Sequence, residues 1–221
     1  NDGISRINIK LKSIDGTEIN GQGPHIDSSH IEQLMNRLRR LESGDVLVLA
    51  GSIPAGISDN IYKDIMDMLK DKGVQIVVDA TSRLLTNVLE YNPFFIKPNQ
   101  HELGDIFNVT LNTQEEVIPY ALELKKMGAV NVCVSMGGKG AILVADDGNV
   151  YKAKAPDGIL KNSVGAGDSL VAGFLSGWIE KKDYEYAFRK GVATGSASAF
   201  SERLATNGEV NDLIGKVTII R

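Results

Sequence analysis

The chain has 221 residues, 43% hydrophobic and 24% charged, a composition typical of an ordinary globular domain with a sizeable core. Its net charge of -4 gives no basic surplus, which argues against a nucleic-acid partner. No apolar run reaches the ~20 residues that span a bilayer, and no signal-peptide pattern opens the chain. We therefore expect no membrane partner and a cytoplasmic location.

The first 24 residues predict a β ribbon and its connection to the rest of the chain. Residues 6–12 alternate polar and apolar side chains, which is typical of a half-exposed strand. A turn at Asp15-Gly16 and a second extended piece at 17–20 would complete the ribbon.

Residues 25–221 predict an α/β core. Ser29 and Glu32 have capping-box spacing ahead of a helix with one apolar face, and Thr113 with Glu116 would cap another helix. Apolar strands are expected at 46–50, 74–79, 94–97, 131–135 and 217–220, with an antiparallel pair at 140–144 and 150–154. Further helices are expected at 58–72, about 166–180, 183–203 and 208–215. Such alternation predicts a largely parallel sheet with helices on both faces.

Four of these strands run into polar or glycine-rich loops. The loops are 50–54, 79–81, 97–102 and 135–140. Ligands of open parallel sheets bind at the carboxyl ends of the strands. The sequence therefore predicts a site at that edge.

The segment Gly165-Ala166-Gly167-Asp168 precedes an apolar helix rich in small residues. Backbone amides at such a helix start can bind an anion. Asp168 could accept the proton of a hydroxyl that attacks a phosphoryl group held there. The alternative is an ordinary Asp N-cap, and spacing alone does not decide between the two.

Three further segments also have two interpretations each. Asn99 and Glu102 could face one magnesium ion through water, or could form a capping box. The loop 135–140 could approach a nucleotide or be a tight turn, and it matches neither the dinucleotide fingerprint nor the P-loop. The small residues at 191–200 could pack closely on a neighbour or leave room for a purine.

Together these motifs resemble the phosphofructokinase-B branch of the ribokinase-like sugar kinases. The segment 162–174 is similar to the second family signature, Lys97-Pro-Asn-x-x-Glu102 to its magnesium and phosphate motif, and Val134-Ser-x-Gly-x-x-Gly140 to its nucleotide loop. Segments 5–12, 17–24 and 199–206 resemble bacterial 1-phosphofructokinases most, with tagatose-6-phosphate kinases second.

The resemblance implies an ATP- and Mg2+-dependent kinase that phosphorylates a hydroxyl of a phosphosugar, fructose 1-phosphate first among them. Asp168 would be the base, and the amides of Gly165, Ala166, Gly167 and Asp168 the anion hole. The donor site would comprise Lys97, Asn99, Glu102, Ser135, Gly137, Gly138, Lys139, Gly140, Val192 and Ser196, with Asn99 and Glu102 acting on magnesium through water. Arg6 would hold the substrate phosphate and Ser52 would lie near the sugar.

The resemblance also implies a ribokinase-like fold in which the ribbon is part of a lid and a possible homodimer interface. The N-terminal third of the family has no counterpart here, so we expect the C-terminal two-thirds of a longer enzyme, with impaired activity when isolated. Other ribokinase-like kinases and a non-catalytic nucleotide or sugar-phosphate sensor remain alternatives.

Overall fold

The computed structural model describes residues 5–10, 18–21, 23–54 and 56–221. The elements are β1 (Asn8–Lys10), β2 (Glu18–Asn20), α1 (Ser28–Leu38), β3 (Val46–Ala50), α2 (Ile61–Leu69), β4 (Gln75–Asp79), α3 (Ser82–Thr86), η1 (Leu89–Tyr91), β5 (Phe95–Ile96), α4 (Gln100–Phe107), α5 (Gln114–Lys126), β6 (Val132–Ser135), η2 (Gly137–Lys139), β7 (Ala141–Val144), β8 (Val150–Ala153), α6 (Ala166–Lys181), α7 (Tyr184–Ala199), α8 (Asn207–Ile214) and β9 (Ile219–Ile220). The predicted turn at Asp15-Gly16 lies outside the described residues.

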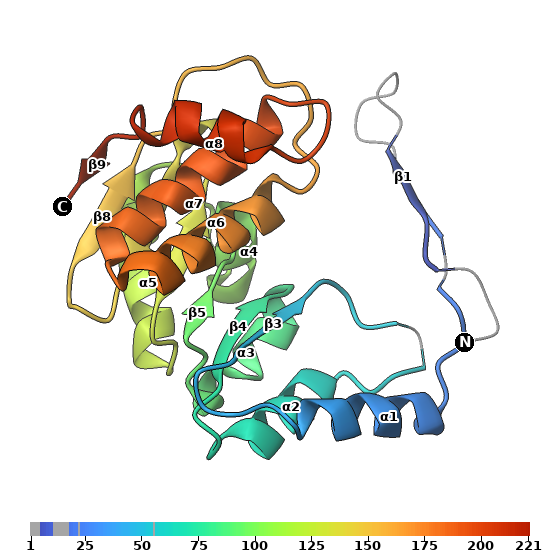
Figure 1. The fold of residues 1–221 in the computed structure, drawn as a ribbon. Helices are drawn as coiled ribbons and strands as arrows, with labels where there is room; N and C mark the ends of the chain where they lie inside the picture. The colour runs from blue at the N-terminus through green and yellow to red at the C-terminus, as the bar shows by residue number, and fades with distance from the viewer. Residues whose placement is uncertain (1–4, 11–17, 22, 55) are drawn as a thin grey trace.

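A seven-stranded sheet in the order β3-β4-β5-β6-β7-β8-β9 forms the centre of the molecule (Figure 1). Strands β3 to β6 pair in parallel, whereas β7, β8 and β9 continue the sheet antiparallel. The change occurs after β6 because only residues 136–140 join it to β7, and so short a turn permits only antiparallel pairing. The predicted largely parallel sheet is confirmed, with a mixed second half.

Helices cover both faces of the sheet, because consecutive residues of one strand pack against different helices. Val78 and Ile96 join a core cluster with α2, α4 and α5, while Val77 and Phe95 join a second cluster with α6 and α7. Phe95 stacks on Phe174 of α6, with ring centroids 4.1 Å apart. None of the helices within the described ranges is both long and apolar enough to cross a bilayer.

Helices α6 and α7 lie close together, as the small residues of α7 allow. A Cβ added at Gly191 would lie 2.9 Å from the carbonyl oxygen of Leu170, and one at Gly195 2.9 Å from that of Ala166. Both distances are too short for a real Cβ contact. Close packing therefore accounts for these glycines, the first of the two interpretations left open above.

The ends of several helices differ from the predictions. Helix α2 spans Ile61–Leu69 rather than 58–72. The expected Ser29–Glu32 capping box is wrong, because Asp27 is the N-cap of α1 and its carboxylate accepts a hydrogen bond from the His30 amide at 3.0 Å. Helix α7 ends at Ala199 rather than at 203, because the buried Ser198 hydroxyl accepts a hydrogen bond from the Ala205 amide at 3.0 Å. This bond folds the chain back before another helical turn can form.

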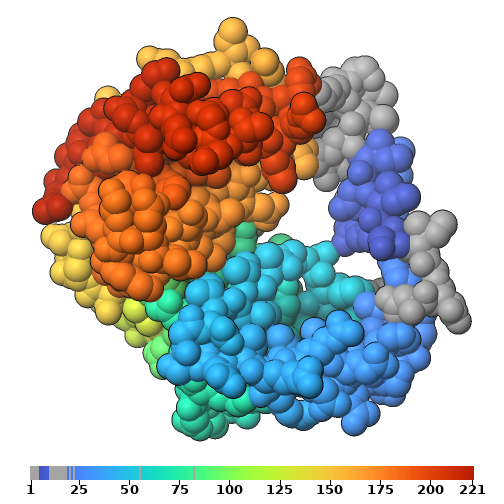
Figure 2. All heavy atoms as spheres, in the orientation of Figure 1, coloured from blue at the N-terminus to red at the C-terminus, as the bar shows by residue number. Residues whose placement is uncertain are grey.

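The ribbon of β1 and β2 stands beside the α/β body, and Figure 2 shows an open space between them. The strands pair antiparallel, with Ile9 opposite Ile19. Ile7, Ile9 and Ile19 are exposed, and period-two alternation places them on one face. Arg6 lies on the other face and reaches the body, where its Nη1 donates to Ser52 Oγ at 2.7 Å.

Candidate active site

The carboxyl ends of the four parallel strands meet along one edge of the sheet. Asp79 ends β4, Lys97 directly follows β5, and Ser135 ends β6. The Gly51 amide after β3 donates to the Asp79 carbonyl at 3.1 Å, and the Ser135 amide donates to the Pro98 carbonyl at 3.1 Å. These bonds hold the predicted loops side by side at the place where parallel sheets bind ligands.

Asp168 lies at the start of α6 but does not cap it. Gly165 is the N-cap, with a φ of 78° that favours glycine, and Asp168 is the third residue of the helix. The Asp168 carboxylate is exposed and makes no hydrogen bond or ion pair with any residue that the structure describes. The alternative that Asp168 is an ordinary N-cap is therefore wrong, and its oxygens remain available to a ligand.

The helix start also provides donors for an anion. Among the described residues, the amides of Gly167 and Asp168 donate to no protein oxygen, whereas the Ala166 amide donates to the Ser163 carbonyl at 3.3 Å. Two amides and the positive end of the helix dipole therefore face outward beside the Asp168 carboxylate.

Lys97 lies directly beneath this helix start. A Cβ added at Gly167 would be 3.2 Å from Lys97 Nζ, so the ammonium lies close against the backbone there and a side chain would have to displace it slightly. Lys97 Nζ also forms an ion pair with Asp79 Oδ1 at 3.2 Å, and the two side chains are only 7% and 16% exposed. Burial raises the pKa of Asp79 above its usual value, while Lys97 opposes the rise.

Asp79 is a site residue for which the sequence predicted no role, although the loop that it opens was singled out. The negative charges of Asp168 and Glu102 add to the rise in its pKa, so both carboxylates lie near enough to Asp79 to act on its charge. A strand of the parallel sheet that ends in a carboxylate was the available signal.

Asn99 and Glu102 form a reciprocal capping box at the start of α4. The Asn99 side chain accepts from the amides of His101 and Glu102 at 2.8 and 2.9 Å, and Glu102 Oε2 accepts from the Asn99 amide at 2.7 Å. The capping interpretation of this motif is therefore confirmed. It leaves a metal role open, because a carboxylate has about four acceptor positions. Within the described ranges, no three His, Cys, Asp or Glu side chains gather closely enough to hold a metal ion directly.

The loop after β6 is a short 3-10 turn, η2, that faces open space. A Cβ added at Gly137 or Gly138 would meet no atom within 4 Å. Gly140, in contrast, is enclosed, because a Cβ there would lie 2.0 Å from the Ala153 carbonyl oxygen. Lys139 Nζ donates to the Asn112 carbonyl at 2.8 Å, so its ammonium points back to the protein.

Comparison with known proteins agrees with this geometry. The family model for pfkB family carbohydrate kinases matches residues 2–209. The chain belongs to the pfkB family of carbohydrate kinases. The resemblance inferred from the motifs and the ribokinase-like α/β fold are thereby confirmed.

Three similar pfkB-type proteins show how far the match extends. The chain is 45% identical over 219 residues to the 1-phosphofructokinase of Bacillus subtilis, covering 99% of this chain and 72% of that protein. It is 32% identical to the D-tagatose-1-phosphate kinase of Bacillus licheniformis, again covering 72% of that protein. A solved Staphylococcus aureus structure, assigned as a phosphofructokinase, is 43% identical with a TM-score of 0.86, and the match covers 92% of this chain and 66% of that one.

The other residues predicted for the pfkB site fall into two groups. Arg6 and Ser52 meet across 46 residues of sequence, where the ribbon touches the loop after β3. Val192 is 4% exposed and packs in the second core cluster, so little of its side chain can contact a base, whereas Ser196 is half-buried.

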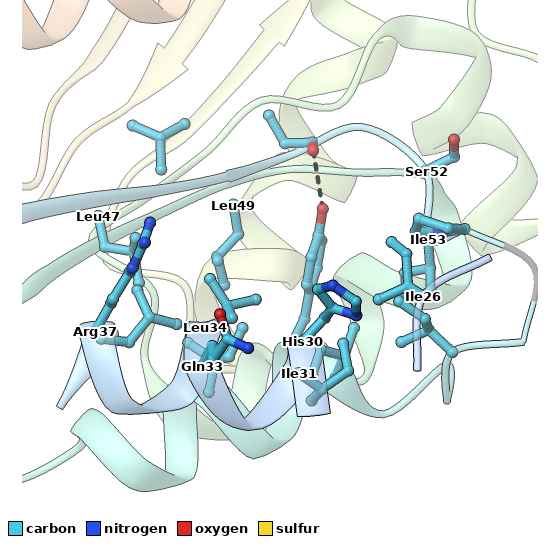
Figure 3. Close-up of a pocket in the computed structure, with 18 residues that line it drawn as sticks. Ile26, His30, Ile31, Gln33, Leu34, Arg37, Leu47, Leu49, Ser52 and Ile53 are labelled. Atoms are coloured by element: carbon cyan, nitrogen blue, oxygen red, sulfur yellow. Dashed lines mark hydrogen bonds between the residues drawn. The ribbon is translucent and has the colours of Figure 1, made fainter. Parts of the chain in front are cut away.

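An apolar groove of about 760 Å³ lies beside this site, between α1, β3 and α2 (Figure 3). Ile31 and Leu34 of α1 face Leu47 and Leu49 of β3 across it. Among the described residues that line it, Ser52, at one end, is the only predicted site residue. The groove is therefore separate from the polar cluster around Asp168.

Proposed function

We propose that this pfkB-family protein transfers the γ-phosphoryl group of ATP to the C6 hydroxyl of fructose 1-phosphate, giving fructose 1,6-bisphosphate and ADP. The observation that carries the proposal is the uncommitted Asp168 carboxylate beside two outward-facing amides and the buried ammonium of Lys97. A binding protein without chemistry has no need of a carboxylate where a polyphosphate must be accommodated.

The transfer step follows from this arrangement. The acceptor oxygen attacks the γ-phosphorus while its O–H bond breaks and the proton passes to Asp168. The bond from the γ-phosphorus to the bridging oxygen breaks, and the electron pair leaves with ADP. Negative charge spreads over the transferring group, where the amides of Gly167 and Asp168 and the nearby Lys97 ammonium stabilise it.

The charges of the site fit a divalent cation. Asp79 pairs with the ammonium of Lys97, and Glu102 and Asp168 add two further negative charges that act on Asp79, so negative charge is in excess before any nucleotide enters. When bound, Mg2+ supplies the positive charge that the β- and γ-phosphates need. Asn99 and Glu102 would hold it through water.

The ATP molecule would lie along η2, with Ser135, Gly137, Gly138, Lys139 and Gly140 beside it. Ser196 would lie toward the base, with the largely buried Val192 behind it. The open space in front of Gly137 and Gly138 supports this placement. Arg6 would take the phosphate that the acceptor already carries, and Ser52, which accepts a hydrogen bond from Arg6, would lie next to the sugar.

The ribbon would close over the sugar and pair with a second copy of the chain. Its polar face carries Arg6 toward the body, while Ile7, Ile9 and Ile19 form an exposed apolar face on the other side. An apolar face on a two-stranded ribbon is typical of an interface. A cytoplasmic location stays a prediction.

A panel of acceptors tests the proposal. The protein is purified at its full natural length and incubated with ATP, Mg2+ and, separately, fructose 1-phosphate, tagatose 1-phosphate, tagatose 6-phosphate, fructose and a nucleoside, and ADP release is measured. We expect the highest kcat/KM with fructose 1-phosphate. The tagatose phosphates are the second candidates, the 6-phosphate from the motifs and the 1-phosphate from the relative's name. Nucleotide binding without turnover of any acceptor would favour a sensor instead.

A further inference from the structure

Gln114, the first residue of α5, bridges two parts of the molecule that meet behind η2. Its side-chain amide Nε2 donates to the Lys139 carbonyl at 3.0 Å and to the Ala153 carbonyl at 2.9 Å. Lys139 belongs to η2, and Ala153 ends β8. The two N–H groups of one amide thus join η2 to the strand that leads toward α6.

A second bond makes the contact reciprocal. Lys139 Nζ donates to the Asn112 carbonyl at 2.8 Å, two residues before Gln114. The segment before α5 is itself held, because the Asn112 amide donates to Glu116 Oε2 at 2.7 Å and Thr113 caps the helix. The turn is therefore fixed from behind by a rigid helix start, while its front, at Gly137 and Gly138, stays open.

We propose that Gln114 is a positioning residue for the nucleotide: its two bonds hold η2 in the position in which the turn can contact the donor phosphates. The inference rests on the proposed function, since it assumes that η2 contacts ATP. Among the described residues, the side chain of Gln114 bonds to η2 and to the end of β8, and not to Asp168, Arg6 or Ser52. It therefore affects donor binding and leaves the acceptor site unchanged.

Three variants test the role. Gln114→Ala removes both bonds to carbonyl groups, and we expect a KM for ATP about 5- to 30-fold higher with the KM for fructose 1-phosphate within about twofold. Gln114→Glu places a carboxylate against two carbonyl oxygens, so the KM for ATP should rise further at pH 8. It should fall part of the way back toward pH 5.5, where the protonated carboxyl regains one donor. The control is Glu115→Ala, which removes an exposed ion pair between α5 and Lys152 of β8 without touching η2, and it should leave the KM for ATP unchanged.

Binding of the fluorescent N-methylanthraniloyl derivative of ATP provides a readout that needs no turnover. If the unsubstituted protein binds the probe and Gln114→Ala binds it equally well, the positioning role is wrong while the kinase proposal stands. If the unsubstituted protein does not bind the probe, the proposed function itself fails. Equal rises in the KM for ATP and the KM for fructose 1-phosphate, together with a lowered melting temperature, would show a structural role only and would also overturn the inference.

Discussion

The buried ion pair between Lys97 and Asp79 offers the sharpest test of the site's electrostatics. Its charged atoms are 3.2 Å apart, and both side chains are largely shielded from water. At an effective dielectric constant of about 20, their attraction is about 5 kcal/mol. Lys97→Met keeps the side-chain length but leaves the Asp79 carboxylate buried without its partner. Breaking such a pair from one side typically costs about 3–5 kcal/mol.

We therefore expect Lys97→Met to lower the free energy of unfolding at pH 7 by about 3–5 kcal/mol, or the melting temperature by about 6–20 °C. Urea unfolding measures the first quantity directly. The matched control is Lys70→Met, which breaks an exposed 3.0 Å pair with Asp67 and should change the free energy of unfolding far less. The double variant with Asp79→Asn removes both charges and should recover much of the loss.

The titration of Asp79 gives the free energy of unfolding a pH dependence of definite sign. The pKa of Asp79 is raised in the folded protein, mainly by burial. Its charged form therefore costs stability at neutral pH, and this cost disappears as the pH falls through the raised pKa toward the usual value of 3.8. Without Lys97 that pKa rises further, so the deficit of Lys97→Met should shrink between pH 7 and pH 5. A pH-independent loss no greater than that of Lys70→Met would refute the reasoning.

Three further predictions concern packing, metal and assembly. An added methyl at Gly195 would meet the Ala166 carbonyl at the start of α6, and one at Gly177 would lie 2.8 Å from Ala187 Cα at the other end of the same helix pair. Both Gly→Ala variants should lower the free energy of unfolding, measured with urea, by about 1–3 kcal/mol. Only Gly195→Ala should also raise the KM for ATP. An equal rise of this KM in both variants would argue against the donor role of the α6 start. Glu102→Gln keeps an acceptor for the Asn99 amide but removes the charge, so the free energy of unfolding should change by less than about 1 kcal/mol. The Mg2+ concentration that gives half the maximal rate should rise. If this concentration is unchanged, Glu102 is excluded from the metal site. Ile9→Asp should convert the expected dimer to a monomer in sedimentation experiments. The control Ile220→Asp, equally exposed but distant in sequence from the ribbon, should not. Dimers of unchanged stability in Ile9→Asp would exclude the ribbon as the interface.

Local sequence patterns predicted the parts of this fold that local forces determine. The apolar strands, the Asn99–Glu102 and Thr113 caps and the glycine-preceded start of α6 all depend on residues within a few positions of one another. The end of α7 could not be predicted in this way, because it depends on a bond from Ala205 to a buried hydroxyl seven residues earlier.

The site shows the same division. Asp168 and the loops were visible as motifs, but the sequence could not show whether Asp168 capped its own helix, since that depends on where the helix begins. The pair of Lys97 with Asp79 and the contact of Arg6 with Ser52 join residues 18 and 46 positions apart on different elements. Only the assembled sheet brings these side chains together.

The turnover number of Asp168→Asn, measured with ATP, Mg2+ and fructose 1-phosphate, tests the assignment of the base most directly. The substitution keeps the size of the side chain and should cost only about 0.3–1 kcal/mol of stability, from the lost charge at the helix start. We predict that kcat falls by about 10²- to 10⁴-fold while the KM for ATP changes little. A kcat reduced less than about tenfold in a folded variant would contradict the role of Asp168 as the base.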